Sequence, residues 1–226
     1  MKKATTTLIL AALLPLLASL FSSCMANRGF VSTVTRDDIQ QIAQFEFLSD
    51  FGVIESGNKI YYDDSLSMVA NDLFTTALAE SNILPVTETI VITDSTVNHK
   101  VEQEIDALKD YIGRNVQTKN LPIPVTIDSI LCSRNERFGL MVYNFGFVRS
   151  TGNYAGQVAL GIALGILSMG SIYWVPYKEM IHSGIIIYDA MNHNFAYVAT
   201  SDWESSPLKA ETHQRQVKRL LRKYSN

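Results

Sequence analysis

The chain has few of the residues that build disulfides and metal sites. It holds two cysteines, Cys24 and Cys132, and four histidines among 226 residues. Two cysteines exclude a disulfide-rich scaffold, and the histidines lack the spacing of a metal-binding motif. The Gly-x-Ser-x-Gly turn of hydrolases, the His-Glu-x-x-His helix of metalloproteases and the glycine-rich phosphate loop are also missing. We therefore expect a protein that is not an enzyme, with no catalytic residues, no metal and no cofactor.

The chain also lacks an excess of basic charge. Lysine and arginine total 19 and aspartate and glutamate total 22, which gives a net charge of −3 at pH 7. Domains that bind nucleic acid usually carry a marked positive charge. Nucleic acid is therefore not an expected partner.

The amino-terminal segment predicts export from the cytoplasm. Two lysines precede an apolar run from Leu8 to Leu20, which Pro15 interrupts. The run is shorter than the roughly 20 residues that a membrane-spanning helix needs. We interpret residues 1–23 as a secretory signal peptide.

The residues from Leu20 to Cys24, with the sequence LFSSC, resemble a bacterial lipobox. The resemblance implies that Cys24 becomes the lipidated, palmitate-bearing first residue of a lipoprotein held in the outer membrane. No acidic run follows Cys24, so we expect the protein to face the periplasm. Residues 24–44 show little apolar periodicity and predict a mobile tether, and residues 45–226 predict a single domain.

Within this domain the sequence predicts an α/β (α+β) fold with a mixed β-sheet and two packed helices. The helical stripes occupy 65–80 and 95–113, and the second has Val101, Ile105, Leu108 and Ile112 on one side. Extended segments are expected at 45–48, 51–54, 59–62, 87–93, 125–132, 138–148, 184–189 and 195–199. The runs at 125–132 and 138–148 predict one hairpin, and those at 184–189 and 195–199 predict another.

The last segment predicts a C-terminal amphipathic helix. From Glu211 onward, Val217, Leu220 and Leu221 alternate with basic residues at helical spacing. Two interpretations of the basic side stay open, namely a solvated surface or a contact with anionic lipid head groups.

Residues 154–176 form an apolar insertion without any charged residue. Its glycines are Gly156, Gly161, Gly165 and Gly170, and they predict a packing or interaction surface, because small residues let another backbone approach closely. Three interpretations stay open: a transmembrane helix, a helix buried in or docked on the body, and an apolar loop that enters a membrane or an oligomer interface. We favour the buried or docked helix.

Other candidate residues have ordinary structural explanations. Asp189 and His193 flank a predicted hairpin turn, where both residue types are common. Cys132 lies in an apolar run and predicts a buried, inert thiol. Residues 202–204, with Trp203 between two acids, predict a surface loop.

Two motifs carry a resemblance to a known family. The segment from Tyr61 to Leu66, YYDDSL, leads into the first helix, and the segment IYDAMN at 187–192 precedes Phe195-Ala196-Tyr197. With the order of elements, these motifs resemble envelope lipoproteins whose body is like the TolB amino-terminal domain or the curli secretion lipoprotein CsgG. The resemblance implies a mixed sheet with helices on it and a structural or assembly role.

We therefore expect a non-enzymatic outer-membrane lipoprotein that acts in cell-envelope assembly or transport through protein–protein contacts. Its expected partners are the membrane, through the lipid anchor, and other envelope proteins or further copies of the chain. The alternative is a periplasmic ligand-binding module or hydrolase whose site has no sequence signature.

Overall fold

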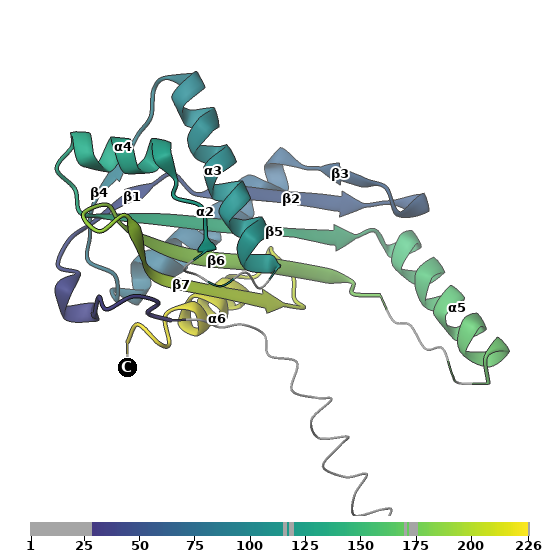
Figure 1. Ribbon diagram of the computed structural model, residues 1–226. Coiled ribbons are helices and arrows are strands. Elements are labelled where there is room, and N and C mark those ends of the chain that lie inside the picture. Colours follow the sequence, from purple (N-terminus) through teal and green to yellow (C-terminus); the bar gives the residue numbers. More distant parts are fainter. Residues whose placement is uncertain (1–28, 115–116, 118–119, 170, 172–175, 226) are drawn as a thin grey trace, which may run out of the picture.

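The computed structural model describes residues 29–114, 117, 120–169, 171 and 176–225. Figure 1 shows the arrangement of its helices and strands. In chain order they are η1 (Arg36–Asp38), β1 (Ile42–Phe45), β2 (Leu48–Ile54), η2 (Ser56–Asn58), β3 (Ile60–Tyr62), α2 (Asp64–Ser81), β4 (Val86–Ile90), α3 (Ser95–Gly113), α4 (Val125–Ser133), β5 (Phe138–Arg149), α5 (Thr151–Leu167), β6 (Glu179–Asp189), β7 (Asn194–Trp203) and α6 (Ala210–Leu220).

The seven strands form one mixed sheet around the long strand β5. β1 and β2 follow each other along one edge of β5, and both run parallel to it. β6 lies antiparallel along the other edge of β5, and β7 pairs with β6. β4 extends the sheet beyond β1, and β3 extends it beyond β2. The expected α/β fold with a mixed sheet is confirmed.

Helices cover both faces of the sheet (Figure 1). α2 and α6 pack together on one face, and α3 and α4 lie on the other. Side chains alternate between the two faces along a strand. Accordingly, Leu140 and Val142 of β5 belong to the core under α2 and α6, whereas Met141 and Tyr143 belong to the core under α3 and α4. The central strands are therefore buried on both sides.

α2 and α3 are the two predicted helices, and each begins at an aspartate cap. The carboxylate of Asp63 accepts a hydrogen bond from the first turn of α2, and that of Asp94 does the same for α3. In α3 the whole predicted stripe is buried, and the helix ends at Gly113 as predicted. In α2 the buried residues are Ala70, Phe74, Ala77 and Leu78. The C-terminal amphipathic helix is also confirmed, because α6 buries its apolar side against α2 and the sheet.

The extended run predicted for 125–132 is wrong, because these residues form helix α4. Ile127 and Leu131 are four positions apart and fully buried, so the apolar residues fill one helical face. The carboxylate of Glu104 on α3 accepts hydrogen bonds from the backbone nitrogens of Thr126 and Ile127 at 2.7 and 3.1 Å. This cap comes from another helix, so no local pattern contains it. The predicted hairpin with β5 is wrong for the same reason.

The predicted hairpin of β6 and β7 is confirmed, with His193 in the left-handed region at φ 48° in its turn. β6 begins at Glu179, earlier than the predicted 184–189. The strand expected within 87–93 is displaced and lies at Val86–Ile90.

The tether predicted over 24–44 is wrong from Gly29 onward, because this part packs on the body. Backbone hydrogen bonds tie Gly29 and Val31 to β7. Val34 and Ile39 are buried in the core under α2 and α6. β1 then begins inside the same range. The signal peptide and the first residues of the tether lie outside the described residues.

Candidate functional site

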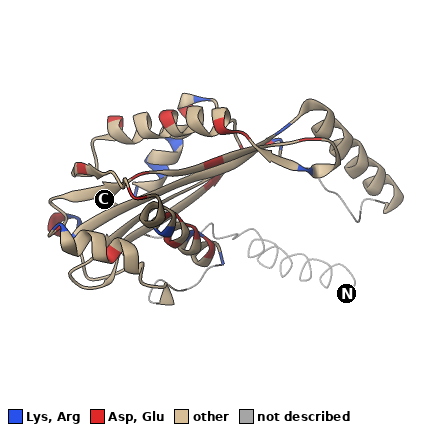
Figure 2. Cartoon of the chain, turned by 90° about the horizontal axis from the view of Figure 1, so that it is seen from above, with Lys and Arg blue, Asp and Glu red and all other residues tan. Residues whose placement is uncertain are grey.

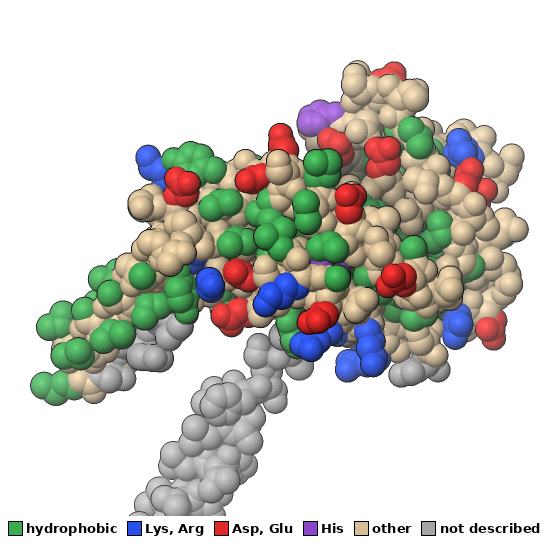
Figure 3. Space-filling model, turned by 180° about the vertical axis from the view of Figure 1, so that it is seen from behind, with side chains coloured by type: hydrophobic (Ala, Val, Ile, Leu, Met, Phe, Trp, Pro, Cys, Tyr) green, Lys and Arg blue, Asp and Glu red, His purple; other side chains and the backbone are tan. Residues whose placement is uncertain are grey.

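Among the described residues, the largest group of exposed apolar side chains lies on and just after α5, which follows β5 after Ser150. We call α5 together with Ser168 and Met169 the apolar arm. Figure 1 shows the arm leading away from the sheet, and Figure 3 shows apolar side chains over its surface. Its main contact with the body is η2, at its base. The helix expected in the insertion is confirmed. The interpretation that this helix is buried or docked is wrong for most of its length, because the described body leaves most of its large apolar side chains exposed.

The outer half of the arm is apolar on opposite sides. Successive residues of an α-helix are 100° apart, so Leu164 and Ile166 point in nearly opposite directions. Both are exposed, as are most of their apolar neighbours, and Leu167 is 81% exposed. The exposed large apolar side chains of the arm are Leu160, Ile162, Leu164, Ile166, Leu167 and Met169. Figure 2 shows no charged residue along the helix, and the sequence has none between Arg149 and Lys178.

A set of polar contacts holds the base of the arm. Nε of Arg149 donates to the carbonyl of Tyr177 at 2.8 Å, and Nη1 donates to the side-chain oxygens of Asn58 and Asn153 at 3.1 and 2.9 Å. Nδ2 of Asn153 donates to the carbonyl of Glu55 at 2.7 Å. We call these five residues the polar clamp. It joins β5, η2, α5 and the segment before β6, so the direction of the arm is set by hydrogen bonds.

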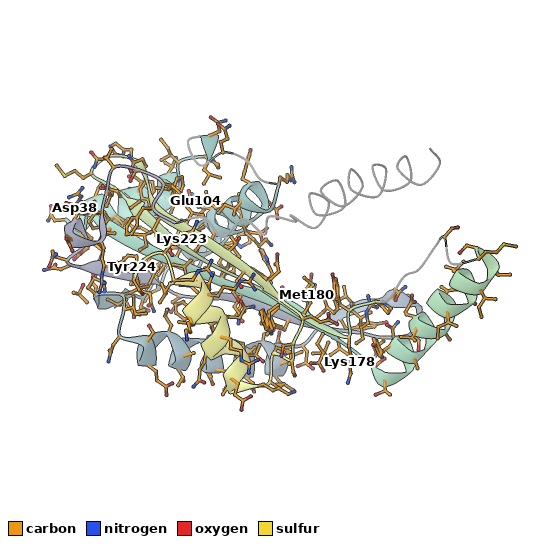
Figure 4. The ribbon with its side chains drawn as sticks, turned by 90° about the horizontal axis from the view of Figure 1, so that it is seen from below. Asp38, Glu104, Lys178, Met180, Lys223 and Tyr224 are labelled. Carbon is orange, nitrogen blue, oxygen red and sulfur yellow. The ribbon has the colours of Figure 1, made fainter. Side chains whose placement is uncertain are left out.

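α6 and the start of the described chain lie side by side. A Cβ atom on Gly29 would be 2.8 Å from Cδ of Lys223, in the turn after α6. Exposed basic residues gather on α6 and directly beside its two ends, namely Lys209, Arg215, Lys218, Arg222 and Lys223. Figure 1 shows the arm sloping toward the side of the sheet on which α6 lies, and Figure 4 labels Lys178 near the base of the arm and Lys223 after α6.

The edge strand β3 exposes a second apolar surface. β3 pairs with β2 along one side only. Its three residues, Ile60, Tyr61 and Tyr62, are all exposed, and Tyr62 is 66% exposed. We call them the aromatic edge. η2 immediately precedes β3, so the aromatic edge begins beside the base of the arm.

The structure does not bring Asp189 and His193 together as a pair. Asp189 is fully buried, and its carboxylate accepts hydrogen bonds from Arg137 at 3.0 and 3.2 Å and from the turn after β6. Burial by itself would raise the pKa of Asp189, but the hydrogen bonds from Arg137 and Asn192 outweigh it and lower the pKa below its ordinary value. Nδ1 of His193 lies 3.0 Å from the carboxylate of Asp128 instead. Asp189 therefore stabilises the turn.

The other histidines are equally dispersed. His182 pairs with Asp202 across β6 and β7, and His99 is exposed on α3. His213 is buried, and this burial lowers the pKa of its imidazole. Within the described ranges, no three His, Cys, Asp or Glu residues gather in a way that could hold a metal ion.

Two smaller predictions need correction. Cys132 is exposed, not buried, because α4 turns Ile127 and Leu131 inward and leaves Cys132 on its outer side. Residues 202 and 203 end strand β7 and do not form a loop. The guanidinium of Arg219 lies over the ring of Trp203, 5.6 Å from its centroid.

The structure describes three of the four insertion glycines. Gly156 faces open space, Gly161 is buried and Gly165 is half-buried. Gly170 and Cys24 lie outside the described residues. The interface role of the glycines and the lipidation of Cys24 stay predictions.

A groove of about 550 Å³ lies between the end of α3 and the sheet. Its wall includes Asp50, Lys109, Phe145 and His182. Burial raises the pKa of the Asp50 carboxyl, and the nearby ammonium of Lys109 partly opposes this. Lys109 itself lies 4.2 Å above the ring of Phe145 and 2.5 Å from the carboxylate of Asp106.

No protein-family model and no curated protein matches the chain. Among solved structures, the PelC dodecamer from Paraburkholderia phytofirmans is 9% identical, with a TM-score of 0.38 over 88% of this chain and 94% of that one. The LpoB C-terminal domain from Salmonella enterica is 8% identical, with a TM-score of 0.30 over 77% and 88%. A DUF4136 family protein from Bacteroides thetaiotaomicron is 5% identical, with a TM-score of 0.29 over 87% and 91%. At these TM-scores the likeness is one of general α/β arrangement and says nothing of function.

None of the helices in the described part combines the length and the apolar character that crossing a membrane requires.

The sequence pattern located the arm but not the clamp that orients it. Arg149 and Asn153 bond to residues of η2 and its flank that lie 91 to 98 positions away in the chain. An arginine and an asparagine beside an apolar run do not indicate which distant residues they will bond to.

Proposed function

We propose that this protein is a non-enzymatic, lipid-anchored protein of the outer membrane that acts in envelope assembly or transport through protein contacts. The observation that carries the proposal is the exposed apolar end of the molecule, formed by the aromatic edge and the apolar arm. Apolar surface left in water forgoes about 25 cal/mol per Å² of burial. A large exposed apolar surface therefore favours a protein that another component of the envelope covers.

The aromatic edge is the surface best suited to a protein partner. An edge strand has main-chain donors and acceptors that can pair with a strand of another chain. Exposed tyrosines also supply large contact area at a low cost in side-chain entropy, and tyrosine is enriched among the residues that dominate binding energy.

Tyr61→Asp is expected to weaken partner capture about tenfold, because loss of a dominant aromatic contact costs more than 1 kcal/mol. The measurement is affinity purification of the membrane-bound, crosslinked protein with quantification of the proteins that accompany it. Tyr111→Asp is the matched control, because Tyr111 is 42% exposed on α3 and lies outside the aromatic edge. Equal partner recovery from wild type and both variants would overturn the role of this surface.

Cys24→Ser is expected to release the protein from the membrane fraction or to leave it as an uncleaved precursor. Each buried methylene of an acyl chain contributes about 0.8 kcal/mol to membrane binding, so loss of the chains removes the main anchor. The measurements are cell fractionation and metabolic labelling with a palmitate analogue. A wild-type protein that takes up no label would contradict the anchor.

The alternative of a periplasmic ligand-binding module is supported by the groove beside α3. Two of its ionisable groups are already engaged with protein partners, since Lys109 pairs with Asp106 and His182 pairs with Asp202. The exposed apolar end has no such internal partner in the described residues, which is why we favour the contact function.

A further inference from the structure

We propose that the outer part of the apolar arm, from Val158 to Met169, enters the hydrocarbon of a lipid bilayer, in the same leaflet that holds the acyl chains of Cys24. This inference rests on the proposed lipid anchor and names the component that covers the arm. The aromatic edge remains the surface for a protein partner.

The distribution of apolar residues around the arm favours lipid over a protein groove. A helix that docks in a groove keeps one polar face toward water. The outer arm has no charged residue, and it is apolar on two nearly opposite sides, where Leu164 and Ile166 are both exposed. A helix with exposed apolar residues on opposite sides needs apolar surroundings on more than one side, and the hydrocarbon of a bilayer supplies them.

The length of the outer arm suits one leaflet. Twelve residues at 1.5 Å each extend about 18 Å, against a hydrocarbon core of about 30 Å. Backbone groups inside lipid must be satisfied within the protein. At the tip, the nitrogens of Ser168 and Met169 donate to carbonyls of the preceding turn at 2.9 and 3.2 Å, which meets part of this need.

The base of the arm has the composition of a membrane–water boundary. Tyrosine is enriched where hydrocarbon meets head groups, and basic side chains lie on the polar side of that boundary. Tyr154 is half-buried and Tyr177 is exposed near the base, and Arg149 and Lys178 flank the uncharged stretch. The polar clamp would thus remain outside the hydrocarbon while the outer arm enters it.

The lipid anchor keeps the bilayer within reach of the arm. Gly29 is tied to β7, and the five Cα–Cα steps between Cys24 and Gly29 span at most about 18 Å. The membrane surface must therefore lie close to the turn after α6, where Lys218 and Arg222 can approach anionic head groups. Figure 1 shows the arm sloping toward this same side. The acyl chains, the basic side of α6 and the arm can therefore meet one bilayer together.

The test uses the full lipidated protein in vesicles of phosphatidylethanolamine and phosphatidylglycerol. Cys132→Ser removes the exposed thiol, and Leu167→Cys then carries a fluorophore that responds to its surroundings. Met191→Cys is the matched control, since Met191 is 73% exposed in the turn at the far end of β6 from the arm. Lipids brominated in their acyl chains are expected to quench the Leu167 label about threefold more than the Met191 label, with the reverse order for aqueous iodide.

Two further readouts separate the possible failures. Adding Ile166→Asp to the labelled protein is expected to abolish the extra lipid quenching, because a charge in the hydrocarbon opposes insertion. If the protein does not float with the vesicles, the lipid anchor fails and the inference fails with it. If it floats but the Leu167 label stays accessible to iodide, the anchor stands and the arm inference is overturned. If the Leu167 labels of different protein copies quench one another and lipid does not quench them, the arm packs against a second copy. That result would also overturn the proposal that the arm enters the bilayer.

Discussion

Arg137→Met is expected to lower the free energy of unfolding by about 2 to 4 kcal/mol, because it leaves the buried carboxylate of Asp189 without its cation. Asp189 is fully buried, whereas Arg137 is 40% exposed. Removing one partner of a buried ion pair typically costs 3 to 5 kcal/mol. The hydrogen bonds from Met191 and Asn192 remain, so we place the expected loss at about 2 to 4 kcal/mol.

Arg134→Met is the matched control. Arg134 also binds a carboxylate with two nitrogens, that of Glu88, but both side chains are exposed. Exposed pairs of this kind contribute about 0 to 1 kcal/mol. Urea denaturation of the two variants at neutral pH measures the contrast. If both variants lose the same free energy of unfolding, the burial of Asp189 does not determine how much the Arg137–Asp189 pair contributes to stability.

The stability contributed by the Arg137–Asp189 pair should also depend on pH. Because the pKa of Asp189 is lower in the folded state than in the unfolded chain, its contribution is fully present above the unfolded value of about 3.9 and declines as pH falls through the folded value. The gap in stability between wild type and Arg137→Met should therefore narrow in acid.

Gly184→Val is expected to destabilise the fold by about 3 kcal/mol through overpacking. Gly184 of β6 lies opposite Tyr143 of β5, and the tyrosine ring covers the glycine. A Cβ atom on Gly184 would be 2.1 Å from Cζ of that ring. The ring is fully buried and stacks on His182 at 5.4 Å, so it has little room to move. Either the ring or the backbone of β6 must shift.

Gly156→Ala provides the comparison for this glycine effect. A Cβ atom on Gly156 meets nothing within 4 Å, and the position is inside α5. Alanine favours a helix over glycine by about 0.5 to 1 kcal/mol. Thermal melting should therefore show a lower melting temperature for Gly184→Val and no loss for Gly156→Ala. A Gly184→Val protein that melts like wild type would mean that the ring of Tyr143 does not close this site.

Local sequence patterns correctly predicted the helices and strands whose stabilising residues are close together in the chain, within one helix or one hairpin. In α3, the four-residue stripe from Val101 to Ile112 and the cap at Asp94 both lie in the helix that they specify. The hairpin of β6 and β7 is similarly local, because the turn and both strands are contiguous. The uncharged stretch after Arg149 was visible as an insertion for the same reason.

The errors occurred where a distant partner decides the conformation or the exposure. Residues 125–132 became helix α4 because Glu104, on another helix, caps their backbone. The exposure of Cys132 followed from this change, since a helix and a strand direct neighbouring side chains differently.

By itself, the sequence determined α3, α6 and the final hairpin, through the spacing of their apolar residues. Its leader and Cys24 predict a membrane anchor. These features depend on residues close together in the chain, so hydrophobic period and local capping suffice to predict them. Only the tertiary structure decided that the apolar insertion is an exposed arm and that Asp189 is a buried structural group. Both outcomes depend on Arg149 and Arg137 reaching partners far along the chain, and such long-range contacts leave no periodic trace in the sequence.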